Sequence, residues 1–587
     1  MSFFQSYTFL ILAVFLCMPL LVSGTYYLYL FSLLILYSIA AIGLSIFTSA
    51  THKQLFSQAA FMGVSAYIVA LVLQALGDWN GLPAISLSIS VVILAALASA
   101  IFGFLISFPA VRLAGPSFAM VTLAIAWISW SIAIQWQPVT GGELGLREFF
   151  PLAKSEVEQR LFYLGILVAF LGLILLYRRV FSSAFGLFHA AYRDDAIALA
   201  ALGVRESDFS RLLLFLATAL AGLAGGLFAL QQDFVNPDSF EVFDGVLIAI
   251  AALIGGLRNV AGPILGVFIV FILPEFFHNL AEYRLLFYGF LVLVILNIAR
   301  DGILPSTRDQ AWRHKSNFND SRNEKLTYIE QASSLEIIGM SRNFGHVKAI
   351  TSVSADIREG EIHGIIGPNG SGKTTLLDLV SGFVERDEGK IAINAYNVSE
   401  QGISDHVGVG ICRTFQKIRN FEGLTCRENL LVALFAHRFR LSLPGMCRSM
   451  FARHSQEQES LIAEHLHAFD LSDIADVDAG NLSQGQKRML ELARVTIVPP
   501  RVLLLDEPTS GLDKQEIETL KQAVQRCSQS GTLILLVDHN LSFVSSVCAT
   551  VTALSDGEVI ASGSPSVVLS SQQVVDVYYG GLEHVDA

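Results

Sequence analysis

The chain contains 587 residues, of which 53% are hydrophobic and only 15% are charged, and its formal net charge is −12. Soluble domains carry roughly 25% charged residues, so the composition excludes an ordinary soluble chain. The acidic balance argues against nucleic acid as a partner, because nucleic-acid-binding faces are basic. The six cysteines show no Cys-x-x-Cys pair and no metal-ligand spacing, which indicates free thiols.

The charged residues are distributed unevenly along the chain. Lysine and arginine are scarce before residue 300, and a stretch of mixed charge then runs from Arg308 to Lys325. The length is sufficient for two large domains. We therefore predict a membrane domain at residues 1–300, a linker at 301–333 and a second domain at 334–587.

Apolar runs long enough to cross a bilayer recur through the first 300 residues. We expect ten helical spans, near residues 8–23, 25–48, 60–77, 84–107, 117–136, 161–177, 211–230, 243–257, 261–277 and 284–299. A signal peptide is the alternative for the first run, but no small-residue cleavage site and polar spacer follow it. The fold class expected for this part is a polytopic, all-α membrane domain.

Charge also predicts the orientation of these spans. Basic residues fall on one set of alternating loops and acidic residues mostly on the other. Cytoplasmic loops are the ones that carry the excess of Lys and Arg, so ten spans place both termini in the cytoplasm. No charged residue lies at the centre of a span, which argues against an ion-coupled transporter.

The cytoplasmic loop at residues 178–210 contains a short alanine-rich segment from Tyr192 to Val204. Its acidic first turn favours a helix N-terminus, and Gly203 is a typical helix end. A short helix between two spans can contact a cytoplasmic domain, so we identify Arg193, Asp195 and Gly203 as candidate coupling residues. An ordinary surface helix is the alternative.

Several segments of the first domain carry a family resemblance. Residues 109–124, Thr140-Gly141-Gly142, the loop at 178–210, Gly255-Gly256-Leu257 and Gly262-Pro263 resemble the inner-membrane permease of bacterial branched-chain amino-acid ABC importers. The similarity covers most of residues 30–300. It departs at residues 50–58, where the family usually has a glycine-rich stretch, and this departure concerns the solute more than the fold.

The second domain contains the octapeptide Gly-Pro-Asn-Gly-Ser-Gly-Lys-Thr at residues 367–374. It fits the phosphate-cradling pattern G-x-x-x-x-G-K-[ST], between an apolar strand at 361–366 and a helix that opens at Thr374. Lys373 is expected to reach the β- and γ-phosphates of ATP, and the Thr374 hydroxyl to bind Mg²⁺. The candidate ATP-binding residues are Phe344 (for stacking on adenine), Gly367, Pro368, Asn369, Gly370, Ser371, Gly372, Lys373, Thr374 and Thr375.

Two acids follow a run of apolar residues at 502–505. Asp506 is expected to hold Mg²⁺, and Glu507 to orient and polarise the attacking water. His539 ends a further apolar strand and matches the switch histidine of ABC ATPases, which contacts the γ-phosphate. Glu507 and His539 are therefore the candidate catalytic residues.

Residues 482–486, Leu-Ser-Gln-Gly-Gln, resemble the ABC signature Leu-Ser-Gly-Gly-Gln, with Gln484 as a departure. The resemblance implies that Ser483, Gly485 and Gln486 face ATP bound on an opposite ATPase. Gln416 matches the Q-loop glutamine of the family, which senses Mg²⁺ and touches the permease. The candidate metal ligands are thus Thr374, Gln416 and Asp506.

The resemblance extends over residues 334–587 to one ATPase subunit of the same importers, so the chain resembles a fusion with the permease first and an α/β P-loop ABC ATPase second. It implies ATP-driven import of a branched-chain or hydrophobic amino acid across the bacterial inner membrane, with ATP and Mg²⁺ as cofactors. The implied partners are a second permease, a second ATPase and a periplasmic solute-binding protein, in a heteromer rather than a homodimer.

Other functions remain as alternatives. Urea, amides and aromatic acids are alternative solutes, because permeases of this type are spread over them. An exporter of the common design needs long cytosolic extensions, for which the loop at 178–210 is too short. Ten spans argue against a soluble assembly factor.

Overall fold

The computed structural model describes residues 25–77, 82–147, 149, 156–276, 289, 293, 302–304, 333–394, 396–399, 402–439, 443–452 and 454–579. The chain divides into two compact units, Met1–Ser182 with Ser207–Ser316, and Ser183–Glu206 with Asn317–Ala587. The segment Ser183–Glu206 thus belongs to the second unit, although it lies within the first 300 residues. The linker expected at 301–333 lies almost wholly outside the described residues.

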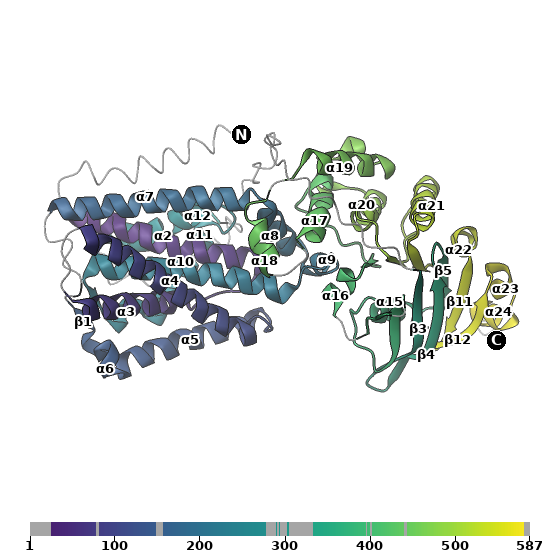
Figure 1. Ribbon diagram of the computed structural model, residues 1–587, viewed down its shortest axis with the longest axis horizontal. Helices are drawn as coiled ribbons and strands as arrows, with labels where there is room; N and C mark the ends of the chain where they lie inside the picture. The colour runs from purple at the N-terminus through teal and green to yellow at the C-terminus, as the bar shows by residue number, and fades with distance from the viewer. Residues whose placement is uncertain are drawn as a thin grey trace. The chain divides into compact units, whose positions relative to one another are not determined.

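Six helices of the described residues are long and apolar enough to cross a membrane. They are α2 (Thr25–Thr51), α3 (Gln58–Leu76), α4 (Leu82–Ala110), α5 (Gly115–Gln135), α7 (Glu156–Phe181) and α10 (Glu206–Gln232), as Figure 1 shows. Each coincides with one of the ten expected runs, so a helical, polytopic membrane unit is confirmed. The core of a bilayer has no water to pair with backbone N–H and C=O groups. An apolar segment is therefore stable there as a helix, which satisfies these groups internally.

The other four expected runs have different outcomes. The run at 243–257 forms the shorter helix α11 (Val242–Gly255), and the run at 261–277 forms α12 (Ala261–Val267), a π-helical turn η4 (Phe268–Ile272) and α13 (Leu273–Phe276). The runs at 8–23 and 284–299 lie outside the described residues.

Glycines allow the helices of the first unit to pack at very short distances. A Cβ atom on Gly225 of α10 would lie 2.0 Å from the carbonyl oxygen of Met62 in α3. A Cβ atom on Gly255 of α11 would lie 1.7 Å from the carbonyl oxygen of Gly262 in α12. Small residues at helix contacts are typical of membrane bundles, and they explain the glycine-rich stretches of the sequence by packing.

Short elements connect the helices at one end of the first unit. β1 (Leu146–Arg147) pairs antiparallel with β2 (Phe234–Val235). The remaining short elements are α6 (Gln137–Thr140), η2 (Gly142–Leu144) and η3 (Pro237–Phe240). Thr140 is buried and its hydroxyl donates to the carbonyl oxygens of Ala133 and Trp136, so the Thr140-Gly141-Gly142 motif fixes the turn that follows α5.

The second unit is built on two sheets. The six-stranded sheet has the order β12-β11-β5-β10-β9-β8, in which only the β12–β11 pair is antiparallel. Its strands are β5 (Ile362–Ile366), β8 (Ile411–Arg413), β9 (Val502–Asp506), β10 (Leu533–Val537), β11 (Thr550–Ser555) and β12 (Glu558–Gly563). Every residue of β5, β9 and β10 is buried, as expected of parallel strands covered on both faces.

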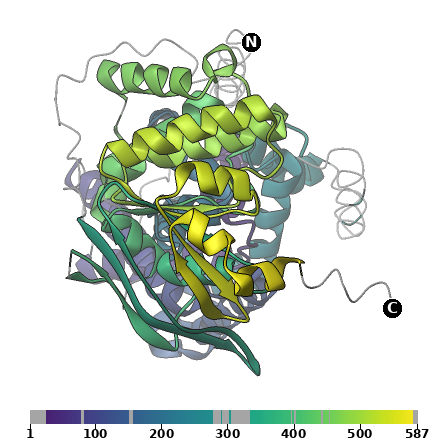
Figure 2. The same cartoon turned by 90° about the vertical axis from the view of Figure 1, so that its right-hand side faces the viewer.

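The second sheet is antiparallel, with the order β4-β3-β6-β7. It contains β3 (Ser334–Phe344), β4 (Val347–Arg358), β6 (Glu388–Ile393) and β7 (Tyr396–Asn397). Its long strands appear in teal along one side of the unit in Figure 2. One buried core, which includes Ile337, Ile365, Leu376 and Leu504, joins both sheets to α15 and so fixes the loop between β5 and α15.

The described residues of the second unit also form helices. They are α8 (Ala184–Asp194), α9 (Ala196–Ala200), α15 (Lys373–Val380), α16 (Ile403–Gly408), α17 (Cys426–Arg438), α18 (Leu443–Ser449), α19 (Gln456–Ala468), α20 (Gln484–Thr496), α21 (Lys514–Gln529), α22 (Leu541–Val547), α23 (Pro565–Leu569) and α24 (Gln572–Tyr579). Four of them begin with a capping box, at Thr425, Ser455, Ser483 and Asp513. Each box satisfies free N–H groups of the first helical turn, so the sequence specifies where these helices start.

Candidate functional site

A glycine-rich loop connects the buried strand β5 to the N-terminus of α15. Gly370 and Gly372 have φ angles of 85° and 95°, which residues with a side chain rarely adopt. A Cβ atom on Gly372 would also lie 2.4 Å from the carbonyl oxygen of Ala349. The loop therefore needs glycine, and its backbone N–H groups surround a helix N-terminus in the arrangement that binds phosphate.

Lys373 is the first residue of α15 and lies across this loop. Its ammonium donates to the carbonyl oxygens of Gly367 (2.9 Å) and Pro368 (2.7 Å). Burial lowers the pKa of Lys373, and the carboxylates of Glu507 and Asp506 oppose this shift. A positive charge thus lies within the loop that the sequence predicts to hold phosphate.

Two of the expected magnesium ligands lie next to each other. The Thr374 hydroxyl donates to Oδ1 of Asp506 at 3.5 Å, although 132 positions separate them in the chain. Burial raises the pKa of the Asp506 carboxyl, and the Arg413 guanidinium, 3.2 Å from Oδ2, opposes this shift. A hydroxyl and a carboxylate beside a phosphate loop are hard oxygen donors of the kind Mg²⁺ prefers, so these residues fit the ion.

Three further candidates meet at one carboxylate. Oε1 of Glu507 lies 3.1 Å from Nε2 of His539 and accepts a hydrogen bond from the Gln416 amide at 3.2 Å. Glu507 has a φ angle of 46°, an uncommon conformation for a residue with a side chain. Backbone strain of this kind gathers at functional sites. The structure therefore brings Gln416, Glu507 and His539 together from separate segments.

Phe344 ends β3 at the tip of the β3–β4 hairpin. Its side chain is 46% exposed, and the Arg342 guanidinium lies 5.1 Å from the ring centroid. An exposed aromatic face is available there for stacking. The adenine contact assigned to Phe344 stays a prediction.

The signature segment forms the start of α20. The Ser483 hydroxyl accepts a hydrogen bond from the Gln486 N–H, and Gln486 Oε1 accepts one from the Ser483 N–H. A Cβ atom on Gly485 would lie 1.8 Å from Oε1 of Glu516. Ser483 therefore presents an exposed hydroxyl at a helix N-terminus, where the helix dipole favours an anion, while Gln486 fixes the cap.

The segment with Arg193, Asp195 and Gly203 is part of the second unit, in which α8 contacts α17 and α18 (Figure 1). Asp195 accepts hydrogen bonds from the Arg419 guanidinium at 2.9 and 3.2 Å and caps α9 by accepting from the Ala198 N–H at 2.8 Å. Asp194, which pairs with Arg193, accepts from the Gly423 N–H at 2.7 Å. The acidic pair thus contacts the segment that follows Gln416.

The shape of this segment differs from the single helix expected between Tyr192 and Val204. The backbone of Asp195 is extended, with a φ angle of −155°, and separates α8 from α9. Its side chain replaces the helical partner of the Ala198 N–H, as N-cap aspartates do. Gly203, with a φ angle of 91°, lies in the turn after α9, in agreement with the helix end predicted at this glycine.

Sequence reasoning missed several residues of the site. Arg413 links Asp506 to Asp378 and Ser381. Asp538 accepts hydrogen bonds from Thr509 and from the Asn540 N–H, which fixes the turns after β9 and β10. Their positions beside Gln416 and His539 in the sequence were the available signal.

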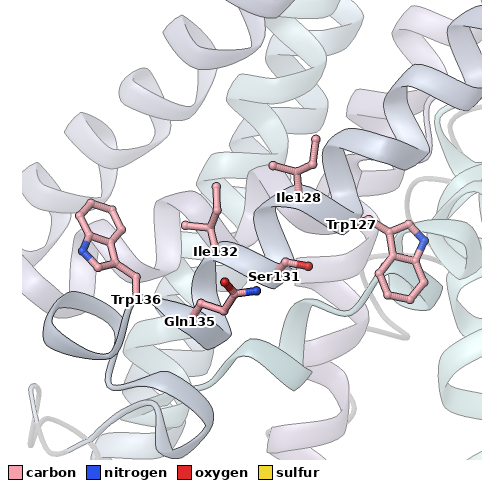
Figure 3. A pocket seen from close by; sticks show the side chains of 6 residues that line it. All are labelled: Trp127, Ile128, Ser131, Ile132, Gln135 and Trp136. Carbon is pink, nitrogen blue, oxygen red and sulfur yellow. The ribbon is translucent and has the colours of Figure 1, made fainter.

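In the first unit, a hollow runs along the outward face of α5 and the residue after it. Its lining residues, shown in Figure 3, are Trp127, Ile128, Ser131, Ile132, Gln135 and Trp136. All six come from one continuous stretch of chain. The hollow is therefore a surface groove and not an enclosed solute cavity.

Two family models match successive parts of the chain. Residues 26–296 match the family model of the branched-chain amino acid transport system permease component, and residues 350–510 match that of the ABC transporters. The chain is 33% identical over 250 residues to the high-affinity branched-chain amino acid transport ATP-binding protein BraF of Pseudomonas aeruginosa, covering 42% of this chain and 97% of the relative. It is 30% identical to the high-affinity branched-chain amino acid transport ATP-binding protein LivG of Escherichia coli K12, and this match covers 42% of this chain and 97% of that protein.

Two further matches cover a similar share of the chain. The lipopolysaccharide export system ATP-binding protein LptB of Haemophilus influenzae is 32% identical, with 41% of this chain and 95% of that protein covered. The structure of an ATP-binding cassette of an ABC transporter in its ADP conformation is 28% identical, covers 42% of this chain and 98% of its own, and has a TM-score of 0.37. The two family models and the ATP-binding relatives show that this chain belongs to the ABC transporters. It is a permease of the branched-chain amino-acid type fused to an ATP-binding subunit, which couples ATP hydrolysis to transport.

Proposed function

We propose that this chain imports a small organic solute, a branched-chain or other hydrophobic amino acid, at the expense of ATP. The observation that carries the proposal is the match of residues 26–296 to a branched-chain amino acid permease component. The ATPase relatives agree, but they include an export protein at 32% identity. The permease match therefore supports the direction of transport and the solute class, with urea, amides and aromatic acids as the alternatives.

The geometry of the second unit supports a role for each residue in ATP hydrolysis. The loop from Gly367 to Thr375 binds the phosphates, with Lys373 supplying positive charge and Phe344 supporting the adenine. Mg²⁺, when bound, would neutralise phosphate charge, and Thr374, Asp506 and Gln416 would hold it. Glu507 orients and polarises the attacking water, and His539 contacts the γ-phosphate and steadies the Glu507 carboxylate.

The position of the signature supports a partner ATPase. Ser483, Gly485 and Gln486 lie at the start of α20, where Ser483 is exposed. This exposure supports a contact of the signature with ATP on an opposite subunit. One chain supplies one phosphate loop and one permease half. We infer that a second permease, a second ATPase and a periplasmic solute-binding protein complete the complex in the inner membrane, with the ATPase and both termini in the cytoplasm.

The surface of α5 supports a partner in the membrane. Only 17% of its most apolar stretch is buried, the lowest share among the six long helices of the described residues. Ser131 and the exposed Gln135 lie between Trp127 and Trp136 on that surface. Small and polar residues are typical of helix–helix contacts in membranes, so we assign this face to the second permease.

The proposal predicts ATP-dependent uptake by a complex of unlike subunits. The tagged chain is purified from its native membrane, weighed, and reconstituted with its binding protein in vesicles that contain ATP. We expect a second permease and a second ATPase in the particle, and uptake of labelled leucine in preference to urea, acetamide or benzoate.

Two results would contradict this. A particle with only two copies of this chain that is active in uptake excludes the heteromer. A particle with active ATPase that does not take up leucine, or that takes up one of the other three solutes in preference to it, contradicts the proposed solute class.

A separate prediction concerns the contact of Asp195 with Arg419. Asp195→Asn keeps the cap of α9, because asparagine is an equally good N-cap, but removes the charge that Arg419 contacts. We expect ATP hydrolysis to continue while solute uptake per ATP falls by about fivefold, the lower end of typical allosteric couplings. Gly203→Val, at a φ angle of 91°, should have a similar effect through the displaced turn.

The control is Asp473→Asn, which removes the charge of an exposed aspartate in the same unit. Uptake per ATP should equal that of the wild type. The coupling role of Asp195 is wrong if Asp195→Asn and the control behave alike.

A further inference from the structure

The helix that begins with the signature buries three charged side chains. Arg488, Glu491 and Arg494 of α20 are 1%, 0% and 2% exposed. Arg488 Nη1 donates to Oε2 of Glu491 at 2.9 Å. Burying charges is costly unless partners compensate them. The hydrogen-bond partners of these three side chains therefore indicate their structural role.

Their partners are backbone groups of the segment from Phe415 to Arg419, which contains Gln416. Arg488 donates to the carbonyl oxygens of Phe415 (2.7 Å) and Gln416 (3.0 Å). Oε1 of Glu491 accepts from the N–H groups of Phe415 and Arg419, both at 3.3 Å. Arg494 donates to the Arg419 carbonyl oxygen at 2.5 Å. Side chains of α20 thus supply hydrogen-bond partners to a segment that follows strand β8.

The same segment carries the contact with Asp195. Arg419 directs its guanidinium to the Asp195 carboxylate, 2.9 Å away, while its own N–H and carbonyl oxygen are held by Glu491 and Arg494. The neighbouring Asn420 donates to the Lys487 carbonyl oxygen of α20 at 2.7 Å. A continuous set of hydrogen bonds therefore leads from Asp195 to the signature helix.

The ionisation of the buried charges is consistent with this arrangement. Burial raises the pKa of the Glu491 carboxyl, while the two guanidinium groups and the two backbone N–H donors act in the opposite direction. Each charged group makes at least one hydrogen bond to a partner of opposite sign or to a backbone group, as buried ions require. Within the described residues, Nε of Arg488 and both Nε and Nη1 of Arg494 make none.

We propose that Arg488, Glu491 and Arg494 form a charged clamp, which holds the Gln416 segment and the signature helix as one rigid body. Displacement of Ser183–Glu206 would then move Gln416 and Ser483 together. The clamp rests on the proposed transport function for its use, but its mechanical part stands on the contacts alone. The three residues position the site and do not touch the reacting atoms.

A structural pathway is not by itself evidence of coupling, so the test measures coupling directly. Glu491→Gln keeps the size of the side chain. It removes the carboxylate that pairs with the Arg488 guanidinium and attracts the Arg494 guanidinium. Glu464→Gln, the same change at an exposed position of α19, is the control. All variants are made in the whole chain and purified in the complex, and ATP affinity reports that the fold persists.

Hydrogen exchange provides the first measurement, and it does not depend on transport. In Glu491→Gln, the amides of residues 415–419 should exchange about tenfold faster than in the wild type, a change of about 1.4 kcal/mol in the opening equilibrium. The amides of α15 should not change. Equal exchange rates in Glu491→Gln and the control would overturn the clamp.

Uptake per ATP provides the second measurement. Glu491→Gln should reduce it by about tenfold, within the range of typical couplings, with little change in the KM for ATP. Combined with Asp195→Asn, it should produce no further loss, because both changes interrupt one connection. Effects that multiply would mean that Glu491 acts on local stability alone and would overturn the proposal. If the wild type shows no uptake, the transport function is wrong, and hydrogen exchange still decides the clamp.

The conservative variant Arg488→Lys separates charge from geometry. Lysine keeps the positive charge beside Glu491 but lacks the planar fork that reaches two carbonyl oxygens. We expect faster exchange at Phe415 and Gln416, and a smaller loss of uptake per ATP than in Glu491→Gln. Full wild-type behaviour of Arg488→Lys would exclude Arg488 from the clamp.

Discussion

The Glu507→Gln variant should bind ATP with nearly wild-type affinity and hydrolyse it about 10²–10⁴-fold more slowly, the usual contribution of a general base. Glutamine keeps an oxygen for the hydrogen bond from Gln416 and for the contact with His539, which lie 3.2 and 3.1 Å from Oε1 in the wild type. It removes the negative charge that polarises water. Binding and chemistry should therefore separate in this variant.

Phosphate release from reconstituted vesicles measures the chemistry, and a fluorescent ATP analogue measures binding. Glu518→Gln on the exposed face of α21 is the matched control and should behave as the wild type. Turnover of Glu507→Gln within a few-fold of the control would show that another group activates the water.

Lys373→Ala should fail at the earlier step, with ATP affinity reduced about 10–100-fold, because hydrogen bonds to charged groups contribute about 1.5–3 kcal/mol each. The ammonium lies within the glycine-rich loop, 2.9 Å from the Gly367 carbonyl oxygen, and supplies positive charge where the phosphates are expected. Hydrolysis at saturating ATP should be less affected than affinity.

The measurement is equilibrium binding of the fluorescent analogue, with a thermal melt to confirm that the loop still folds. Lys390→Ala removes an exposed lysine of β6 and should leave affinity unchanged. An affinity of Lys373→Ala equal to that of this control would contradict the phosphate-binding role.

The sequence predicted the elements that local chemistry determines. Long apolar runs predicted α2, α3, α4, α5, α7 and α10 to within a few residues, because a span needs little more than length and hydropathy. The glycine-rich loop was predicted with its strand and helix, since each glycine there has a conformational reason. The runs at 243–257 and 261–277 form the shorter helices α11 and α12, and hydropathy alone does not distinguish runs near this length from a buried helix.

Contacts between distant segments could not be predicted in the same way. Glu491 lies in the middle of α20, where a lone glutamate in sequence usually indicates a solvent-facing position. Only the fold brings Phe415 and Arg419 to its carboxylate. Asp195 was expected within the first turn of one helix. Its backbone is instead extended, and its carboxylate accepts hydrogen bonds from both the Ala198 N–H and the Arg419 guanidinium.

The assignment of Ser183–Glu206 to the second unit has a consequence for how this gene product can be divided. The chain passes between the two units at residues 182–183, 206–207 and 316–317, so the final junction is one covalent connection among three. The junction at 316–317 raises the effective concentration of each part near the other. It also keeps the two parts in a one-to-one ratio. Encoding the two parts in one gene therefore fixes their ratio. The segment Ser183–Glu206, which contacts the ATPase part, lies within the permease sequence in either case.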